Sequence, residues 1–174
     1  MPFATYQSSK EEAFKNAAKL LAKSGAQAVK LEGGAEMAET TEFLTNRGIP
    51  VMAHIGLLPQ HYNSQGGYKI QGKDYSGRRK LVSDFEAVEK SGAFAVVVEG
   101  VEEKATEAIH KKSKIPVIAI GSGAASDGQV LVTDDILGLT ERPPSFAKRY
   151  ANLTEDIDEA VKNFAAQVKS KLIQ

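Results

Sequence analysis

The chain has 174 residues, of which 42% are hydrophobic and 25% charged, a composition typical of one soluble domain with a hydrophobic core. Its 22 basic and 22 acidic residues give a formal net charge of zero, which argues against a nucleic acid partner. The absence of cysteine excludes disulfides, thiolate metal sites and a cysteine nucleophile. We find no apolar run long enough to span a membrane and no secretory signal at residues 1–14, so we expect a cytoplasmic protein without a membrane partner.

Helical and strand patterns alternate over the first third of the sequence. Ser9 and Glu12 form a capping box, which predicts a helix that begins after Ser9, and Gly25 predicts its end. The predicted inner face of this helix consists of Ala13, Phe14, Ala17, Ala18 and Leu21. The elements expected next are a strand at 26–32, a helix at 35–47 and a strand at 50–57.

Residues 58–78 form a polar segment that is too long for an ordinary connection between a strand and a helix. Such a length indicates a lid or a binding loop, and Gly66 and Gly67 provide hinges. Within it, GYKIQGKD at 67–74 nearly matches the phosphate-binding pattern G-x-x-x-x-G-K-[ST]. We reject that match because Asp74 would repel phosphate, and because we expect no helix to begin there.

The second half of the sequence continues the alternation. The expected elements are a helix at 79–91, a strand at 94–99, a helix at 102–113, a strand at 116–121 and a fifth strand, QVLVTDD, at 129–135. A last helix is predicted from Thr154, with apolar residues at helical spacing: Ile157, Val161, Phe164, Val168 and Leu172. Nearly continuous apolar strands separated by helices predict an α/β fold with a parallel sheet.

An internal repeat suggests a more specific architecture. SGAQAVKLEGG at 24–34 resembles SGAFAVVVEGV at 91–101, and IPVMAHIG at 49–56 resembles IPVIAIGSG at 115–123. The offsets of 67 and 66 residues each cover two strand–helix units, and a unit of about half that length is typical of a (β/α)8 barrel. Because only five strands can be counted, the pattern allows either an open doubly wound sheet or a barrel without its first three units.

Both copies of the repeat end an apolar strand with a glutamate, Glu32 and Glu99. Lys30 shares a strand face with Glu32, and His54 ends the next strand along the chain. Since active sites of parallel α/β folds lie at the carboxyl ends of strands, we expect these side chains at one edge of the sheet. The alternative is that Lys30 and Glu32 form a structural ion pair, that Glu99 is a solvated strand end, and that His54 has a structural role.

The loop GSGAASDG at 121–128 offers a different reading of the site. Loops at the corresponding end of a barrel often hold a phosphate group through backbone N–H groups. A phosphorylated substrate is therefore an alternative.

Several long segments are similar to the ketopantoate hydroxymethyltransferase family: VKLEGG, HIGLLPQ, GGYKIQGK, VVVEGV, IPVIAIGSGAASDGQVLVTDD and LGLTERPPSFAKRYANL. The resemblance implies a partial (β/α)8 TIM barrel, about strands 4–8 with flanking helices. It also implies an Mg²⁺-dependent enzyme of pantothenate biosynthesis that transfers a one-carbon unit from 5,10-methylenetetrahydrofolate to 3-methyl-2-oxobutanoate, a 2-oxo acid. The family implies a homo-oligomeric ring.

The resemblance also implies roles for the four side chains at the predicted edge. Glu32 matches a magnesium ligand, Lys30 a substrate-binding lysine and Glu99 the proton acceptor. His54 matches a histidine at the edge of the site, for which we predict no role.

Family members have about three further strand–helix units before the position of Met1, with two aspartates that complete the magnesium site. We therefore expect a single incomplete barrel domain over residues 1–174, with its C-terminal helix at about 154–172. We expect weak Mg²⁺ binding, little transferase activity for this chain alone, and self-association. Two alternatives are a non-catalytic half-barrel subunit and a (β/α)8 lyase or aldolase that acts on a phosphorylated 2-oxo acid.

Overall fold

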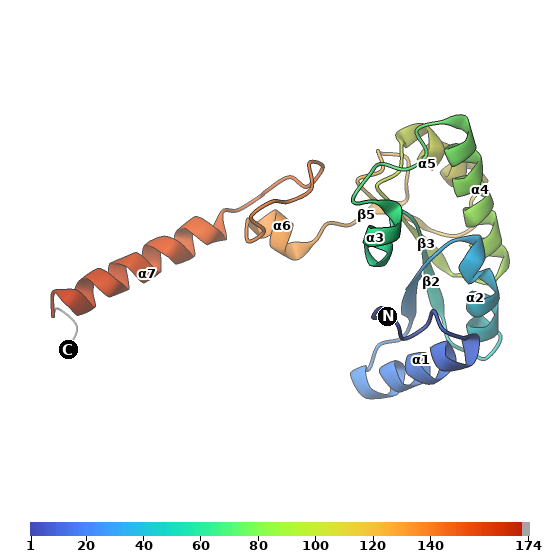
Figure 1. Ribbon diagram of the computed structural model, residues 1–174, viewed down its shortest axis with the longest axis horizontal. Coiled ribbons are helices and arrows are strands. Elements are labelled where there is room, and N and C mark those ends of the chain that lie inside the picture. The colour runs from blue at the N-terminus through green and yellow to red at the C-terminus, as the bar shows by residue number, and fades with distance from the viewer. Residues whose placement is uncertain (172–174) are drawn as a thin grey trace. The chain divides into compact units, whose positions relative to one another are not determined.

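The computed structural model describes residues 1–171, and these divide into two compact units (Figure 1). The first unit spans Met1–Val130, and the second begins at Leu131. The single domain expected over residues 1–174 stays a prediction.

The first unit is built on a five-stranded parallel sheet in the order β1-β2-β3-β4-β5. The strands are β1 (Val29–Glu32), β2 (Val51–Gly56), β3 (Ala95–Glu99), β4 (Val117–Ile120) and β5 (Gly128–Gln129). The main helices of this unit lie on one side of the sheet (Figure 1): α1 (Lys10–Ser24), α2 (Ala38–Thr45), α4 (Tyr75–Lys90) and α5 (Glu103–Lys112). The prediction of an α/β fold with a parallel sheet is confirmed.

Helix α1 begins and ends where the sequence predicted. The Ser9 hydroxyl accepts a hydrogen bond from the Glu12 N–H group at 3.1 Å, which satisfies one of the free donors of the first turn. Gly25 ends the helix with φ at 72°, in the left-handed region that favours glycine. Ala13 and Ala17 are buried in a cluster with residues of β1 and β2, so the predicted inner face is the packed one.

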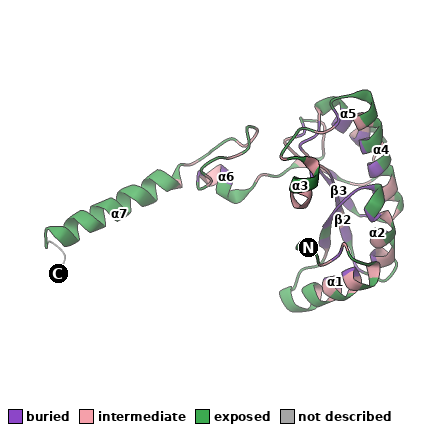
Figure 2. Ribbon diagram, viewed as in Figure 1, coloured by how far each residue is buried: buried purple, intermediate pink, exposed green. Residues whose placement is uncertain are grey.

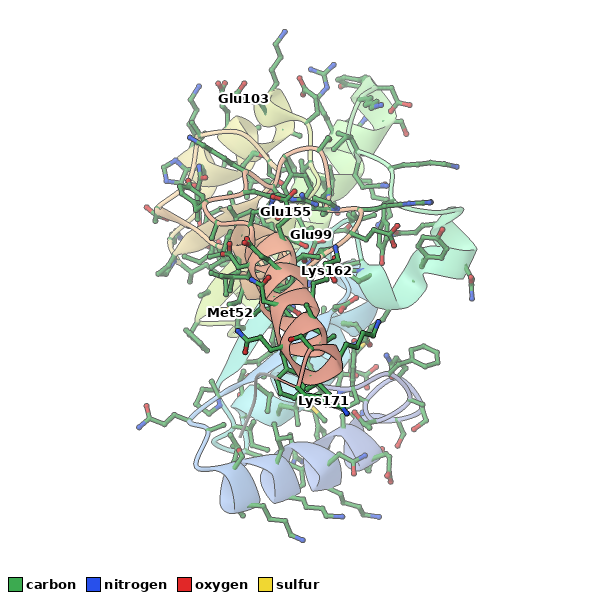
Figure 3. The ribbon with its side chains drawn as sticks, turned by 90° about the vertical axis from the view of Figure 1, so that its left-hand side faces the viewer. Met52, Glu99, Glu103, Glu155, Lys162 and Lys171 are labelled. Carbon is green, nitrogen blue, oxygen red and sulfur yellow. The ribbon has the colours of Figure 1, made fainter. Side chains whose placement is uncertain are left out.

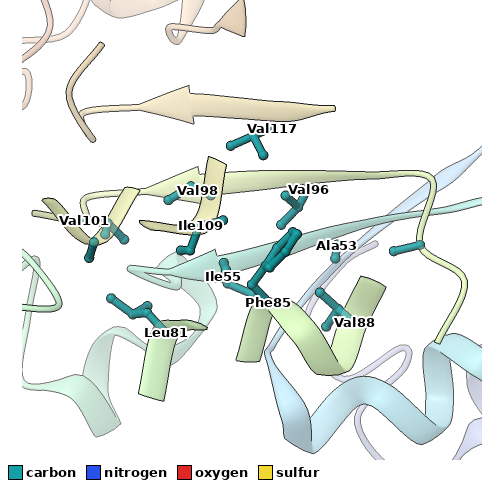
Figure 4. Packing of buried hydrophobic residues seen from close by; sticks show 12 residues of the cluster. Ala53, Ile55, Leu81, Phe85, Val88, Val96, Val98, Val101, Ile109 and Val117 are labelled. Atoms are coloured by element: carbon teal, nitrogen blue, oxygen red, sulfur yellow. The ribbon is translucent and has the colours of Figure 1, made fainter. Parts of the chain in front are cut away.

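The larger core cluster lies between β2–β4 and helices α4 and α5 (Figure 4). Alternate strand residues such as Ile55, Val96 and Val98 point into it, where they meet the buried Phe85 of α4 and Ile109 of α5. Figure 2 shows this burial on the strands and on the inner sides of the helices. The other alternate residues of each strand therefore lie on the opposite face of the sheet.

The predicted fifth strand is wrong for most of its length. Only Gly128 and Gln129 pair with β4, whereas Val130 and Val132 are 47% and 52% exposed. The Asp135 N–H group donates to the Val132 carbonyl, and helix α6 (Thr133–Leu137) contains the last three residues of the predicted strand. Asp134 and Asp135 lie in the first turn of α6, where the helix dipole favours carboxylates.

The segment after β2 contains the short helices η2 (Pro59–His61) and α3 (Tyr62–Gln65), and α4 begins at Tyr75 rather than at 79. Our expectation that no helix begins after GYKIQGKD was therefore wrong. The Asp74 side chain caps α4 by accepting a hydrogen bond from the Gly77 N–H group at 2.6 Å. Because this carboxylate occupies the position that a phosphate would need, the phosphate-loop match is still rejected.

The second unit contains α6 and α7 (Leu153–Lys169). The Tyr150 N–H group donates to the Ile136 carbonyl at 2.8 Å, and the Thr154 hydroxyl donates to the Gly138 carbonyl at 2.6 Å. The apolar residues predicted for the last helix are more than half exposed at Ile157, Val161, Phe164 and Val168, whereas Leu172 lies outside the described residues. Within residues 1–171 we find no helix with the length and apolar character to cross a membrane.

Asp127 ties the loop before β5 to the start of β4, and this contact predicts a pH dependence of stability. The Val117 N–H group, which donates at 2.8 Å, and the nearby His110 ring hold the pKa of the Asp127 carboxyl below its ordinary value of 3.8. The ionised carboxylate therefore stabilises the folded chain above pH 3.8, and this contribution is lost as the pH falls through the lower pKa of the folded state.

We expect Asp127→Asn to lower the urea midpoint of unfolding at pH 7, with a difference from the parent chain that shrinks toward pH 3. Glu107→Gln is the matched control, since no ion pair within residues 1–171 includes Glu107. A deficit at Asp127→Asn that stays constant from pH 7 to pH 3 would contradict the assignment.

Candidate functional site

Polar side chains gather at the carboxyl ends of β1, β2 and β3, on the face of the sheet opposite the core of Figure 4. The strand register places Glu32 beside His54 and Gly56 beside Glu99. Figure 3 labels Met52 and Glu99, which belong to the strand positions that alternate with the core residues. Three neighbouring strands thus bring together the polar residues that the sequence singled out.

A line of contacts joins Lys30, His54 and Glu99. The Lys30 Nζ atom lies 3.1 Å from Nδ1 of His54, and the His54 Nε2 atom lies 3.2 Å from Oε2 of Glu99. A lysine ammonium can only donate, so Nδ1 accepts, and the neutral imidazole carries its proton on Nε2, toward Glu99. His54 therefore connects the cation of β1 to the carboxylate of β3.

The His54 ring is 1% exposed, and its Nε2 atom has no well-directed hydrogen bond within the described residues. The Glu99 carboxylate lies 3.2 Å from Nε2 but is poorly aligned to accept a hydrogen bond from it. A buried donor without a well-aligned acceptor is costly, and the Glu99 carboxylate is the acceptor group that lies beside Nε2. The alternative ion pair of Lys30 with Glu32 is not among the ion pairs formed within residues 1–171.

Glu32 is 7% exposed and is held by a second set of contacts. Its Oε2 atom accepts a hydrogen bond from the Gln60 N–H group at 2.9 Å, and its own N–H group donates to the Tyr6 hydroxyl at 3.2 Å. The Tyr6 hydroxyl in turn donates to Oε1 of Gln60 at 2.8 Å. Burial raises the pKa of Tyr6, so the phenol keeps its proton and can donate at neutral pH.

The segment after β2 is anchored at both ends beside these residues. Gly56 has φ at 95°, and a Cβ atom there would lie 2.4 Å from the Glu99 carbonyl, so only glycine allows this approach. The Leu57 N–H group donates to the same carbonyl at 2.7 Å. Further on, the Gln71 N–H group donates to the Gly100 carbonyl at 2.8 Å, which returns the segment to the end of β3.

A pocket of about 230 Å³ lies between this segment and α4. Its lining includes His61, Gln65, Gln71, Lys80 and Asp84. Ile55 also lines the pocket, and because Ile55 points into the helix-side core, the pocket opens on the other side of β2 from His54.

A model of the ketopantoate hydroxymethyltransferase family matches residues 1–172. The chain belongs to this family. Two curated relatives are 3-methyl-2-oxobutanoate hydroxymethyltransferase 1 of Pseudomonas aeruginosa (strain UCBPP-PA14), 54% identical, and 3-methyl-2-oxobutanoate hydroxymethyltransferase of Paramagnetospirillum magneticum, 51% identical. Each alignment covers 98% of this chain and 63% of the relative, so the chain spans less than two thirds of these relatives' length. A relative from Bordetella petrii is 49% identical over 98% of this chain and 62% of its own length.

The four side chains proposed from the family resemblance therefore occupy one edge, and their roles stay predictions. His54 contacts both Lys30 and Glu99, while Glu32 accepts a hydrogen bond from Gln60. Tyr6 and Gln60, which hold Glu32 in place, were not predicted as site residues. Gln60 ends the segment HIGLLPQ, but Tyr6 lies outside the quoted motifs, and only the folded chain brings the two together over 54 positions.

The residues of this hydroxymethyltransferase family member do not by themselves fit a magnesium site. No cluster of three or more His, Asp or Glu side chains in residues 1–171 could hold a metal ion. Mg²⁺ requires six oxygen ligands in near-octahedral geometry, and one oxygen of Glu32 already accepts a hydrogen bond from Gln60. The described residues thus offer Glu32 as a single carboxylate ligand.

The loop at 121–128 gives little support to a phosphorylated substrate. The Ala124 N–H group donates to Oε1 of Glu103 at 3.4 Å, and a Cβ atom on Gly123 would lie 2.6 Å from the Glu103 side chain. A carboxylate at this position repels a phosphate group and competes for its donors.

We expect Tyr6→Phe to lower the free energy of unfolding by about 1–3 kcal/mol, because the substitution removes both hydrogen bonds of a buried hydroxyl. Urea unfolding at neutral pH measures this loss. Tyr75→Phe is the control, since Tyr75 is 72% exposed and should change the stability by less than about 0.5 kcal/mol. Equal effects of the two substitutions would show that the Tyr6 contacts do not hold Glu32.

Proposed function

We propose that this chain carries the proton-abstracting half of a 3-methyl-2-oxobutanoate hydroxymethyltransferase. The proposed reaction moves a one-carbon unit from 5,10-methylenetetrahydrofolate to 3-methyl-2-oxobutanoate and gives 2-dehydropantoate. The observation that carries the proposal is the contact line of Lys30, His54 and Glu99 in a chain whose residues 1–172 match the family. The names of the curated relatives support the choice of substrate.

Each residue of the contact line has a proposed task. The Lys30 ammonium binds the negatively charged oxygens of the 2-oxo acid and stabilises the enolate that forms from it. The Glu99 carboxylate, whose side chain is 16% exposed, accepts the proton from C3. His54 lies between the two and holds both side chains at the same edge, and its Nε2–H group can donate to a substrate oxygen.

The proposed transfer is balanced without a redox step. Glu99 takes the C3 proton, and the electron pair of that bond remains as the enolate. The enolate carbon forms a bond to the one-carbon unit, which the folate supplies at the oxidation level of formaldehyde. Both bonds between this carbon and the two folate nitrogens break, and water provides the hydroxyl group. Tetrahydrofolate leaves with two protons, one that Glu99 took from C3 and one from the water.

The proposal includes one protein ligand for Mg²⁺ but not a complete magnesium site. Glu32 is the proposed protein ligand, and a bound Mg²⁺ would supply Lewis-acid polarisation of the 2-oxo acid. The described residues lack the further ligands, so we assign no step to the metal. The incomplete ligand set favours a second candidate function, a non-catalytic half-barrel subunit that still binds the 2-oxo acid.

We further infer that the sheet corresponds to about strands 4–8 of a (β/α)8 barrel. Glu32 of β1 pairs with His54 of β2, which pairs with Val97 of β3. Glu99, the counterpart of Glu32 in the sequence repeat, therefore lies two residues further along β3, and two strand steps separate β1 from β3. One residue per strand is the stagger of an eight-stranded barrel with shear 8. The homo-oligomer and the cytoplasmic location stay predictions from the sequence.

The proposal predicts that the chain, with Mg²⁺ present, exchanges the C3 hydrogen of 3-methyl-2-oxobutanoate for deuterium in heavy water. Proton NMR measures the rate of this exchange. We expect Glu99→Gln to slow this exchange by about 10²- to 10⁴-fold, because it removes the base. Lys30→Met should weaken binding of the 2-oxo acid, measured by calorimetry. Complete transfer by this chain alone should be slow or absent, because Glu32 is its only proposed metal ligand.

Glu107→Gln and Lys111→Met are matched controls on α5, away from the contact line, and should leave exchange and binding unchanged. Exchange at the parent rate in Glu99→Gln would contradict the proposed base. Binding of the 2-oxo acid without any exchange would favour the non-catalytic subunit.

A further inference from the structure

Residues 62–80, called the basic segment below, concentrate positive charge in a chain whose formal net charge is zero. The basic segment contains five basic residues, Lys69, Lys73, Arg78, Arg79 and Lys80, and one acidic residue, Asp74. The Asp74 carboxylate caps α4, and Lys80 pairs with Asp84 at 2.5 Å. No ion pair within residues 1–171 includes any of the other four basic side chains.

Exposed aromatic rings accompany these charges. Three of the chain's five tyrosines lie in the basic segment, and Tyr62, Tyr68 and Tyr75 are 47%, 68% and 72% exposed. The rings of Tyr62 and Tyr68 meet edge to face at 4.8 Å, and the Arg79 guanidinium lies 5.8 Å from the centre of the Tyr75 ring. Exposed aromatic rings interleaved with cations are suited to a ligand that is both aromatic and anionic.

The basic segment is anchored at the candidate site. The Gln71 N–H group donates to the carbonyl of Gly100, the residue that follows Glu99, and Lys69 and Lys73 lie two positions before and after Gln71 in the sequence. Both lysines are exposed. The two lysines therefore lie on either side, in sequence, of a residue that is anchored at the end of β3.

The proposed folate co-substrate has the required chemistry. Its one-carbon unit bridges a nitrogen of the pterin and the nitrogen of the p-aminobenzoyl group, and a glutamate follows at the far end of that group. Cells extend this end with γ-linked glutamates, each of which adds one carboxylate. The 2-oxo acid, by contrast, has a single carboxylate, which the proposed function assigns to Lys30.

We propose that the basic segment binds the oligoglutamate tail of the folate co-substrate, with Lys69 and Lys73 as its principal cations. This proposal rests on the proposed function for the identity of the ligand. The cations attract successive carboxylates, so affinity rises with the number of glutamates and falls with ionic strength. Phosphate and nucleotides are the competing polyanions.

The test uses N-(p-aminobenzoyl) γ-glutamate oligomers with one or five glutamates, which lack the pterin and cannot react. Calorimetry with the 174-residue chain should show that the five-glutamate probe binds at least about tenfold more tightly in low salt. Lys69→Glu combined with Lys73→Glu should remove this difference. The neutral pair Lys69→Gln and Lys73→Gln should reduce it partly, and circular dichroism checks that both variants fold.

Lys15→Glu combined with Lys19→Glu is the matched control, because these exposed lysines of α1 give the same change in charge. This control should retain the preference for the longer probe. Equal affinities of the two probes, or an equal loss in the control, would overturn the proposal. Displacement of the five-glutamate probe by pyrophosphate at equal concentration would show an unselective anion surface and would also overturn it.

Binding of 3-methyl-2-oxobutanoate to the unaltered chain, measured separately, distinguishes this proposal from the proposed function. If the chain does not bind the 2-oxo acid but binds the five-glutamate probe in a way that depends on Lys69 and Lys73, the proposed function is contradicted. The proposal for the basic segment is then still supported. If the chain binds the 2-oxo acid but shows no lysine-dependent binding of the five-glutamate probe, only the proposal for the basic segment is overturned.

Discussion

Parallel pairing of β1, β2 and β3 is the constraint on which the candidate site depends. Parallel strands end at a common edge, and the period-two alternation of side chains puts every second residue on the same face. The register that sets Glu32 beside His54 and Gly56 beside Glu99 leaves Lys30, His54 and Glu99 within contact distance. A shift of one residue in β2 would turn His54 into the helix-side core and break both of its contacts.

The two faces of the sheet differ in their side chains: one face forms the hydrophobic core and the other carries the candidate site. The helix side is filled by aliphatic residues and Phe85, whose burial stabilises the unit through the hydrophobic effect. The other face holds ionisable groups: His54 is buried between the exposed Lys30 and the partly buried Glu99, and contacts both. The Tyr6 and Gln60 contacts extend this support to Glu32, and they tie the start of the segment after β2 to the same edge.

Much of this arrangement could be predicted from the sequence, because local rules govern it. The capping box at Ser9, the alternation of apolar strands with helices and the two Glu-Gly strand ends identified the elements and the edge. The start of α4 was misplaced because the capping role of Asp74 was interpreted only as repulsion of phosphate. The central position of His54 and the hydrogen bonds of Tyr6 could not be predicted, since they depend on register and on contacts distant in sequence.

The contact line of Lys30, His54 and Glu99 is tested most directly by nitrogen-15 NMR of the His54 ring at pH 8. The account predicts that Nδ1 of the neutral ring is an unprotonated acceptor and that Nε2 carries the proton. It also predicts that Lys30→Met shifts the Nδ1 resonance. A proton on Nδ1, or a ring whose resonances do not respond to that substitution, would contradict the account.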